Sequence, residues 1–298
     1  MSPRLPIDET TIAALSIALP RLDGVAVLRD APVGRMTALR TGGLADLLVH
    51  VATPAALIAA TALLKRVTCP WRVLWPFDPM VARDGGIQGA AISLGAGFEC
   101  LDAGPDGSVI LGAATPFAAL AAAGPSFSAL ASWSGTPGAL LTAGQGHRLA
   151  GPCAAITAVT QRSIRRRTIP ATAAPGSPAR GTTPVSIQLR PVPPATPAPL
   201  LPGQLLEPDG PLLEVGGTSG EVAHKIADVG LAESRLRGWR ISKAWPGLAV
   251  QSGEGTAADL ELFARGLSEN LHREHGMVTK VAIRTFGRSP TNTRPRKR

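Results

Sequence analysis

The sequence contains no tyrosine, and aromatic residues make up only 4% of its 298 residues. This scarcity disfavours a base-stacking platform for nucleic acid, which needs aromatic rings among basic residues. Only three cysteines occur, Cys69, Cys100 and Cys153, and they form no CxxC pair. Their number and spacing argue against a disulfide framework and a zinc site, so we expect buried thiols in a reducing cytoplasm.

Long apolar runs are also missing. A helix that spans a bilayer needs a stretch of about 18 or more apolar residues, and the sequence contains none. The beginning of the chain has Asp8 and Glu9 before a short apolar stretch, and Pro20 and Arg21 after it. A signal peptide has a basic start, so an amphipathic helix capped near Asp8 or Thr10 is predicted instead. We expect a cytoplasmic protein without a membrane span.

Positive charge is abundant, with a formal net charge of +9 and a pI of about 10.6. Such a balance favours anionic partners, but a solvated basic surface with a basic tail is the preferred interpretation. Part of the excess lies in a basic cluster of Arg162, Arg165, Arg166 and Arg167. No aromatic residue interleaves with it, so nucleic acid is disfavoured and a solvated loop is expected, with anion binding left open.

The order of patterns predicts a mixed α/β chain. A Thr-Pro helix start at residues 53–54 lies between strand-like runs, and two further strand-like runs at residues 89–94 and 108–115 are linked by a turn at 103–108. Near the end, Thr256 and Asp259 have the spacing of a capping box before an apolar stripe, which predicts a long helix. Six prolines within residues 191–202 predict an extended linker.

Four segments stand in order along the chain: LRTGGLADLLV, VARDGGIQGAAISL, SGTPGALLTAG and GEGTAADLELFARGLSENLHREHG. Together they resemble the UDP-N-acetylenolpyruvoylglucosamine reductase (MurB) family of peptidoglycan synthesis. The resemblance covers residues 36–287 and implies an FAD-binding MurB-like fold, with two α/β subdomains and a smaller C-terminal α+β subdomain. In that family NADPH reduces FAD, which passes hydride to an enolpyruvyl ether.

The resemblance and the composition together predict a division of the chain. Its parts are an N-terminal helical segment at 1–35, an FAD-binding-like α/β domain at 36–190, a Pro-rich linker at 191–202, a MurB C-terminal-like domain at 203–287 and a disordered basic tail at 288–298.

The first flavin loop implied by the resemblance is altered. The family has Gly-Gly-Gly-Ser-Asn where this chain has Trp75-Pro76-Phe77-Asp78-Pro79. Two prolines remove N–H donors, two large rings add bulk, and a carboxylate would face phosphate. Each charge-assisted hydrogen bond lost costs roughly 1.5–3 kcal/mol, so flavin binding through this loop is not expected.

The second flavin loop matches in Ser134, Gly135, Thr136, Pro137 and Gly138, which are the candidate cofactor-binding residues. The glycines that follow in the family are Leu141 and Thr142 here, after Leu140. A turn kept only for its backbone shape is the alternative interpretation of this match.

No catalytic residue is predicted, since the aligned acid–base positions are substituted. Gln204 stands near the family's proton-donating serine, Ala282 replaces its glutamate and Trp245 replaces a histidine, while Ser242 is retained. An amide cannot supply a catalytic proton. Three side chains within one helical turn, His272, Glu274 and His275, lack further ligands, so no metal site is predicted either.

These observations support one hypothesis and leave two others open. The first is a pseudoenzyme without FAD, which binds a protein of cell-wall synthesis or division, or a nucleotide sugar or other anion. The second is a divergent but active reductase that uses FAD and NADPH. The third is a basic anion-binding module.

Overall fold

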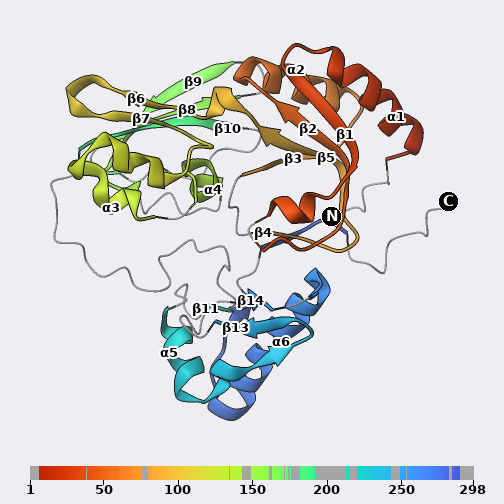
Figure 1. The fold of residues 1–298 in the computed structure, drawn as a ribbon, viewed down its shortest axis with the longest axis vertical. Helices are drawn as coiled ribbons and strands as arrows, with labels where there is room; N and C mark the ends of the chain where they lie inside the picture. The colour runs from red at the N-terminus through yellow and green to blue at the C-terminus, as the bar shows by residue number, and fades with distance from the viewer. Residues whose placement is uncertain are drawn as a thin grey trace. The chain divides into compact units, whose positions relative to one another are not determined.

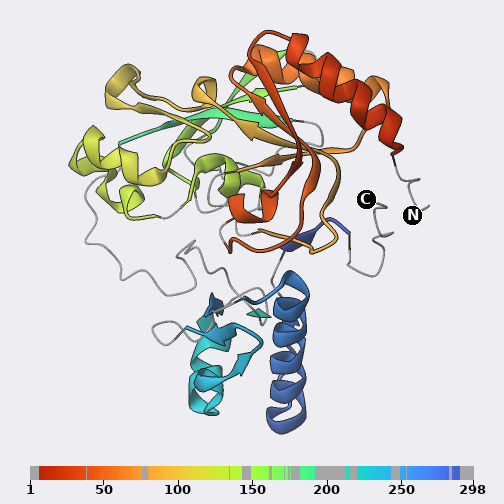
Figure 2. The ribbon, with the colours of Figure 1, turned by 45° about the vertical axis from the view of Figure 1, so that its right-hand side comes forward.

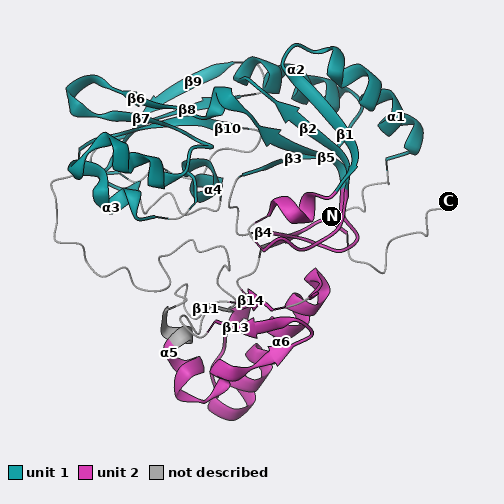
Figure 3. Cartoon of the chain, in the orientation of Figure 1, with its two compact units in different colours: residues 1–31, 45–78, 88–198 teal, residues 32–44, 79–87, 199–298 magenta. Residues whose placement is uncertain are grey.

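In the computed structural model the chain forms two compact units, each built from separate segments (Figure 3). Unit 1 contains residues 1–31, 45–78 and 88–198, and unit 2 contains residues 32–44, 79–87 and 199–298. The structure describes residues 7–37, 39–75, 80–133, 135–142, 149–160, 163–170, 172–173, 175, 182–191, 213–214, 220–242, 249–252, 254–281 and 284–288.

The first sheet of unit 1 has the strand order β1-β2-β5-β3. Its outer pair β1–β2 is antiparallel, and β3 runs parallel to β5. Inward residues of β2 alternate with more exposed ones, which is the period of a half-buried strand. The strands are β1 (Val25–Ala31), β2 (Ala45–Val51), β5 (Ile87–Leu94) and β3 (Trp71–Leu74).

Two helices, α1 (Glu9–Ala18) and α2 (Pro54–Arg66), lie together beside this sheet (Figures 1 and 2). The Asp8 carboxylate accepts the Thr11 N–H at 2.6 Å, and the Thr53 hydroxyl accepts the Ala56 N–H at 3.1 Å. Both predicted helix starts are therefore confirmed. The segment 1–35 also contains a strand, β1, so it is not only helical; the local pattern did not reveal its pairing with β2.

The second sheet of unit 1 is wholly antiparallel, with the order β6-β7-β10-β8-β9. The turn at residues 103–108 connects β6 to β7, so the sequence patterns missed the short strand β6 before it. A 3₁₀ helix at Phe117–Ala123 comes after β7 in the chain, and α3 (Ser128–Ala131) follows it. The strands are β6 (Leu101–Ala103), β7 (Val109–Gly112), β10 (Thr183–Leu189), β8 (Cys153–Val159) and β9 (Ile164–Thr168).

Unit 2 has its own core against α6 (Ala257–His275), whose buried stripe includes Leu260, Phe263 and Leu267. The predicted capping box is confirmed, because Thr256 Oγ1 accepts the Asp259 N–H while the Asp259 carboxylate accepts the Thr256 N–H. Gly276 ends the helix at a φ of 63°, in the left-handed region that glycine tolerates best.

The remaining elements of unit 2 are short. They are α5 (Gly220–Asp228), the sheet β12 (Arg235–Leu236), β13 (Trp239–Ile241) and β14 (Ala249–Gln251), the pair β11 (Leu213–Glu214) and β15 (Lys280–Val281), and the parallel pair β4 (Met80–Ala82) and β16 (Arg284–Phe286). The predicted linker lies outside the described residues from 192 on.

Candidate functional site

The two segments that resemble flavin loops meet inside unit 1. The indole of Trp75 is 2% exposed and packs in the hydrophobic core of that unit. It lies directly against Gly138, where an added Cβ would stand 2.1 Å from the indole Cζ3 atom. Only glycine allows this approach of ring to backbone. A tryptophan in the first segment thus occupies the space beside the second.

Protein acceptors already use the backbone donors of the second segment. The Gly138 N–H donates to the Ala113 carbonyl at 2.9 Å, and the Leu140 N–H donates to the Thr136 carbonyl at 3.1 Å. The Ala139 N–H donates to Thr136 Oγ1 at 3.3 Å. The two bonds to Thr136 form the start of the short helix α4 (Pro137–Thr142). The N–H groups of this helix start therefore already have acceptors within the protein.

Neighbouring elements fix the shape of this turn. The Gly135 carbonyl accepts the Phe117 N–H at 3.0 Å, and Gly135 itself has a φ of 87°. Phe117 also packs edge-on against Trp133, with ring centroids 5.5 Å apart. Thr136, Pro137 and Gly138 are buried with it. Four of the five predicted residues therefore lie together in one buried turn, and Ser134 lies outside the described residues.

A flavin diphosphate needs a hollow lined by N–H donors. The described residues here offer instead an indole ring in contact with glycine, and three N–H groups whose bonds are made. They do not fit that group. Pro76, Phe77, Asp78 and Pro79 lie outside the described residues, so this misfit concerns Trp75 and the turn at 135–140.

The other aligned positions of the reductase resemblance form no second site in the described chain. Ser242 follows directly after β13 in unit 2 and is buried, with 7% of its surface exposed. Gln204, Trp245 and Ala282 lie outside the described residues.

Two groups of charged side chains also bear on the predictions. His272, Glu274 and His275 are exposed on the last turns of α6, and no group of three metal-ligating side chains occurs in the described ranges. The basic cluster is a strand rather than the expected loop, because residues 164–168 pair with β8. Arg165, Arg166 and Arg167 lie exposed on β9, while Arg162 lies outside the described residues.

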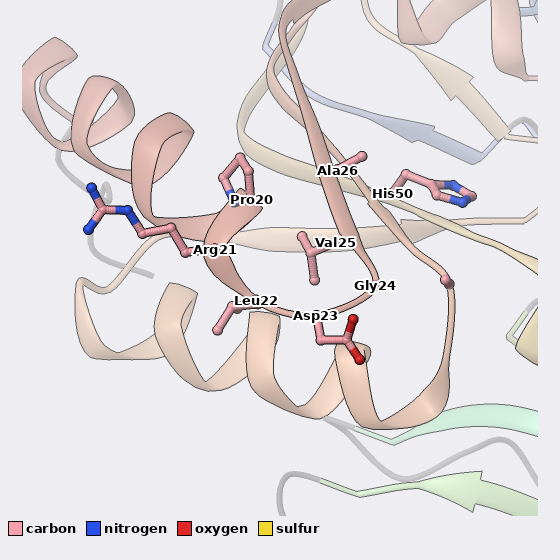
Figure 4. A pocket seen from close by; sticks show the side chains of 9 residues that line it. Pro20, Arg21, Leu22, Asp23, Gly24, Val25, Ala26 and His50 are labelled. Atoms are coloured by element: carbon pink, nitrogen blue, oxygen red, sulfur yellow. The ribbon is translucent and has the colours of Figure 1, made fainter.

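A surface groove beside β1 carries charged groups but no converging chemistry (Figure 4). Arg21 and His50 extend in opposite directions at its two ends, and Asp23 points away from both. His50 Nδ1 lies 3.2 Å from Ser93 Oγ, which is a local surface contact. Nucleophile, base and orienting group are not brought together among these lining residues, so this groove gives no support for catalysis.

All three cysteines are free thiols. Burial raises the pKa of Cys69 to about 11, with a smaller contribution from the Asp46 carboxylate. Burial likewise raises the pKa of Cys153 to about 11, against the opposing effect of Arg190. Such thiols are protonated and poor nucleophiles at neutral pH. The prediction of buried thiols is confirmed for Cys69 and Cys153, whereas Cys100 is only partly buried.

Across the part of the chain that the structure describes, every helix is too short or too polar to pass through a bilayer. No family model matches the chain. Relatives in sequence are nevertheless found.

The chain is 38% identical over 91 residues to UDP-N-acetylenolpyruvoylglucosamine reductase of Anaeromyxobacter sp. (strain Fw109-5), which is 30% of this chain and 28% of that protein. It is 38% identical over 132 residues to the enzyme of the same name from Azorhizobium caulinodans, 43% of this chain and 42% of that protein. These matches therefore span less than half of each relative.

The fold comparison extends further along the chain. The MurB structure from Thermus caldophilus superposes with a TM-score of 0.67 and 19% identity, over 88% of this chain and 99% of that one. The α/β FAD-binding MurB-like fold predicted from the motifs is thus confirmed. The chain has the fold of UDP-N-acetylenolpyruvoylglucosamine reductase and resembles that family in sequence over parts of its length.

Proposed function

We propose that this protein is a MurB-like pseudoenzyme that binds no FAD and acts in peptidoglycan synthesis through binding or regulation. One observation carries the proposal: the indole of Trp75 is buried against Gly138, in the segment that the resemblance assigns to the flavin. The N–H groups of Gly138, Ala139 and Leu140 are also engaged with protein acceptors.

The relatives named as reductases motivate the link to the cell wall. Retention of the fold without a flavin cradle is consistent with a chain selected for its surface or for a nucleotide-sugar ligand. We propose a division protein or a cell-wall enzyme as the partner. A cytoplasmic location is consistent with the three free thiols, which a reducing compartment preserves.

The visible absorbance spectrum of the purified full-length protein tests the proposal. We expect a colourless protein that takes up no flavin from excess FAD after gel filtration. We also expect no NADPH oxidation with the enolpyruvyl nucleotide sugar. A stoichiometric flavin spectrum would contradict the proposal and favour the alternative, a divergent active reductase.

A loop-replacement variant provides the matched control. In it residues 75–79 become Gly-Gly-Gly-Ser-Asn, which removes the indole and restores N–H donors. If the second loop is still competent, this variant gains FAD affinity that the wild type lacks. Equal FAD binding by the wild type and the variant would show that Trp75 does not exclude the cofactor.

A further inference from the structure

The strand β9 forms an open edge of the second sheet in unit 1, next to β8 (Figure 1). All five of its residues, from Ile164 to Thr168, are exposed, so the strand is uncovered on both faces. Edge strands present unpaired backbone groups on which another extended chain can pair.

The register shows which groups point outward. Thr160 N–H donates to the Ser163 carbonyl at 2.7 Å, and Ile169 N–H donates to the Ala154 carbonyl at 2.7 Å. Antiparallel pairs alternate between bonded and non-bonded. Every second pair between these two hydrogen-bonded pairs is therefore also hydrogen-bonded. Arg165 and Arg167 accordingly form their backbone hydrogen bonds with β8. The N–H and C=O groups of Ile164, Arg166 and Thr168 therefore face the open edge, and within the described part of the chain they have no backbone partner.

The side chains of this edge are strongly basic. Arg165 and Arg167 project from one face of β9 and Arg166 from the other, because successive side chains alternate. The Arg166 guanidinium donates to Gln188 Oε1, and Gln188 Nε2 donates to Ser108 Oγ at 2.7 Å. Among the described residues none of the three arginines forms an ion pair with a carboxylate. Positive charge thus lies on both faces of a strand with outward backbone donors and acceptors.

These properties restrict the partner. A second copy of β9 would place arginines against arginines, which is repulsive. A nucleic acid would gain phosphate contacts to the N–H groups and arginines but no aromatic stacking, and its phosphates offer no donors to the outward C=O groups. An acidic polypeptide in extended conformation satisfies both the backbone groups and the charges.

We infer that β9 is a docking strand for an acidic, extended segment of a partner protein, which adds to the sheet by backbone pairing. The pairing uses the outward groups of Ile164, Arg166 and Thr168, and glutamate or aspartate side chains of the partner meet the arginines on the two faces. This inference names the chemistry of the partner and does not depend on whether flavin binds.

Two substitutions at one position separate backbone pairing from charge. Arg166→Ala removes the charge but keeps the outward N–H, whereas Arg166→Pro removes both. Neither interrupts the bonds to β8, because Arg166 occupies a non-bonded pair, and proline is tolerated at such edge positions. Circular dichroism and thermal melting of both variants check that the fold is retained.

The probe is a fluorescent peptide of alternating glutamate and valine, titrated with full-length protein and followed by anisotropy. We expect binding that weakens with salt, and roughly tenfold weaker binding for Arg166→Pro than for Arg166→Ala, which is the effect of about one lost hydrogen bond. Arg165→Glu together with Arg167→Glu should abolish binding. Replacement of Arg235, Arg265 and Arg273 by Ala, which removes comparable charge from other elements, should change binding little.

Three outcomes would overturn the inference. They are no binding of the peptide, equal binding by Arg166→Pro and Arg166→Ala, and tighter binding of single-stranded RNA or phosphatidylglycerol vesicles than of the peptide with equal effects of both variants. Either of the last two outcomes would indicate that β9 binds polyanions through its charge alone, without backbone pairing. The absorbance spectrum of each sample reports flavin separately, so failure here and failure of the proposed function are distinguishable.

Discussion

At the scale of the residue, the contact between Trp75 and Gly138 fixes the local packing, and the proposed exclusion of FAD rests on it. The ring fills a place where a Cβ on residue 138 would overlap it at 2.1 Å. Neither residue can change alone without a cavity or a clash, because protein interiors are closely packed. The effects of substitutions at positions 75 and 138 on stability should therefore be coupled.

We expect Trp75→Ala to lower the free energy of unfolding by about 3–5 kcal/mol. Gly138→Ala should also be destabilising, since a methyl group meets the indole. The double variant should lose less than the sum of the two, because the added methyl group then enters the space left by the ring. Urea unfolding measures all three, and strict additivity would contradict the contact.

The buried thiols give a second expectation at this scale. Cys69 and Cys153 have pKa values of about 11 in the folded protein, against 9.0 ordinarily. Their stabilising contribution is present below pH 9.0 and is lost as pH rises toward 11, because only the unfolded chain then ionises freely. Unfolding midpoints should fall as pH rises through this window, and Cys69→Ala with Cys153→Ala should flatten that fall.

At the scale of the element, α6 is stabilised from two directions. The Asp84 carboxylate accepts the N–H groups of Ala257 and Ala258 at 3.0 and 2.9 Å, although it lies 173 residues before the first of them. Thr256 and Asp259 add the local capping box. A carboxylate at a helix N-terminus also meets the positive end of the helix dipole.

Asp84→Ala should therefore lower the free energy of unfolding by about 1–3 kcal/mol, since two charge-assisted bonds are lost. Thr256→Ala should lower the free energy of unfolding by about 1 kcal/mol, because the N-cap side chain is lost. Asp84→Asn is the control, because it keeps one acceptor oxygen and should lose less than Asp84→Ala. Hydrogen exchange at the first turn of α6 reports the effect locally, and unchanged exchange in Asp84→Ala would refute the long-range cap.

Asp259 adds a pH dependence to the same helix end. Its hydrogen bond with Thr256, followed by the influence of Arg237, lowers the pKa of this carboxyl below its ordinary value. The associated stabilisation is present above the ordinary value of 3.8 and is lost as pH falls through the lowered pKa. Acid unfolding of Asp259→Asn should consequently show a weaker pH dependence than that of the wild type.

Local chemistry predicted many elements but not their distant partners. The caps at Asp8, Thr53 and Thr256 are short-range, and their helices begin where the side chains indicated. The short strand β6 and the edge strand β1 owe their structure to pairing with other strands, which periodicity cannot reveal. The same holds for the candidate site. The motif predicted the turn at 135–138 from local sequence, but the contact of Trp75 with Gly138 joins distant segments and is visible only in the folded chain.

At the scale of the whole molecule, the two hydrophobic cores share no residue. Leu267→Ala should create a cavity in unit 2 and cost about 2–5 kcal/mol there. Amide exchange should accelerate in α6 and β13 while β2 and β5 keep their protection. Leu262→Ala, at a half-exposed position on the same helix, is the control that should change little. Faster exchange throughout both units would indicate a single cooperative core.

The interleaving of the two units has a consequence for synthesis of the chain. Residues 79–87 leave the ribosome early, yet β4 within them pairs with β16 at residues 284–286. Nascent β4 must therefore wait until residues 284–286 emerge before its parallel partner is present, and Asp84 must likewise wait for the helix that it caps. Unit 2 can close only after β16 has been translated, so a fragment that ends before β16 would carry an incomplete second unit.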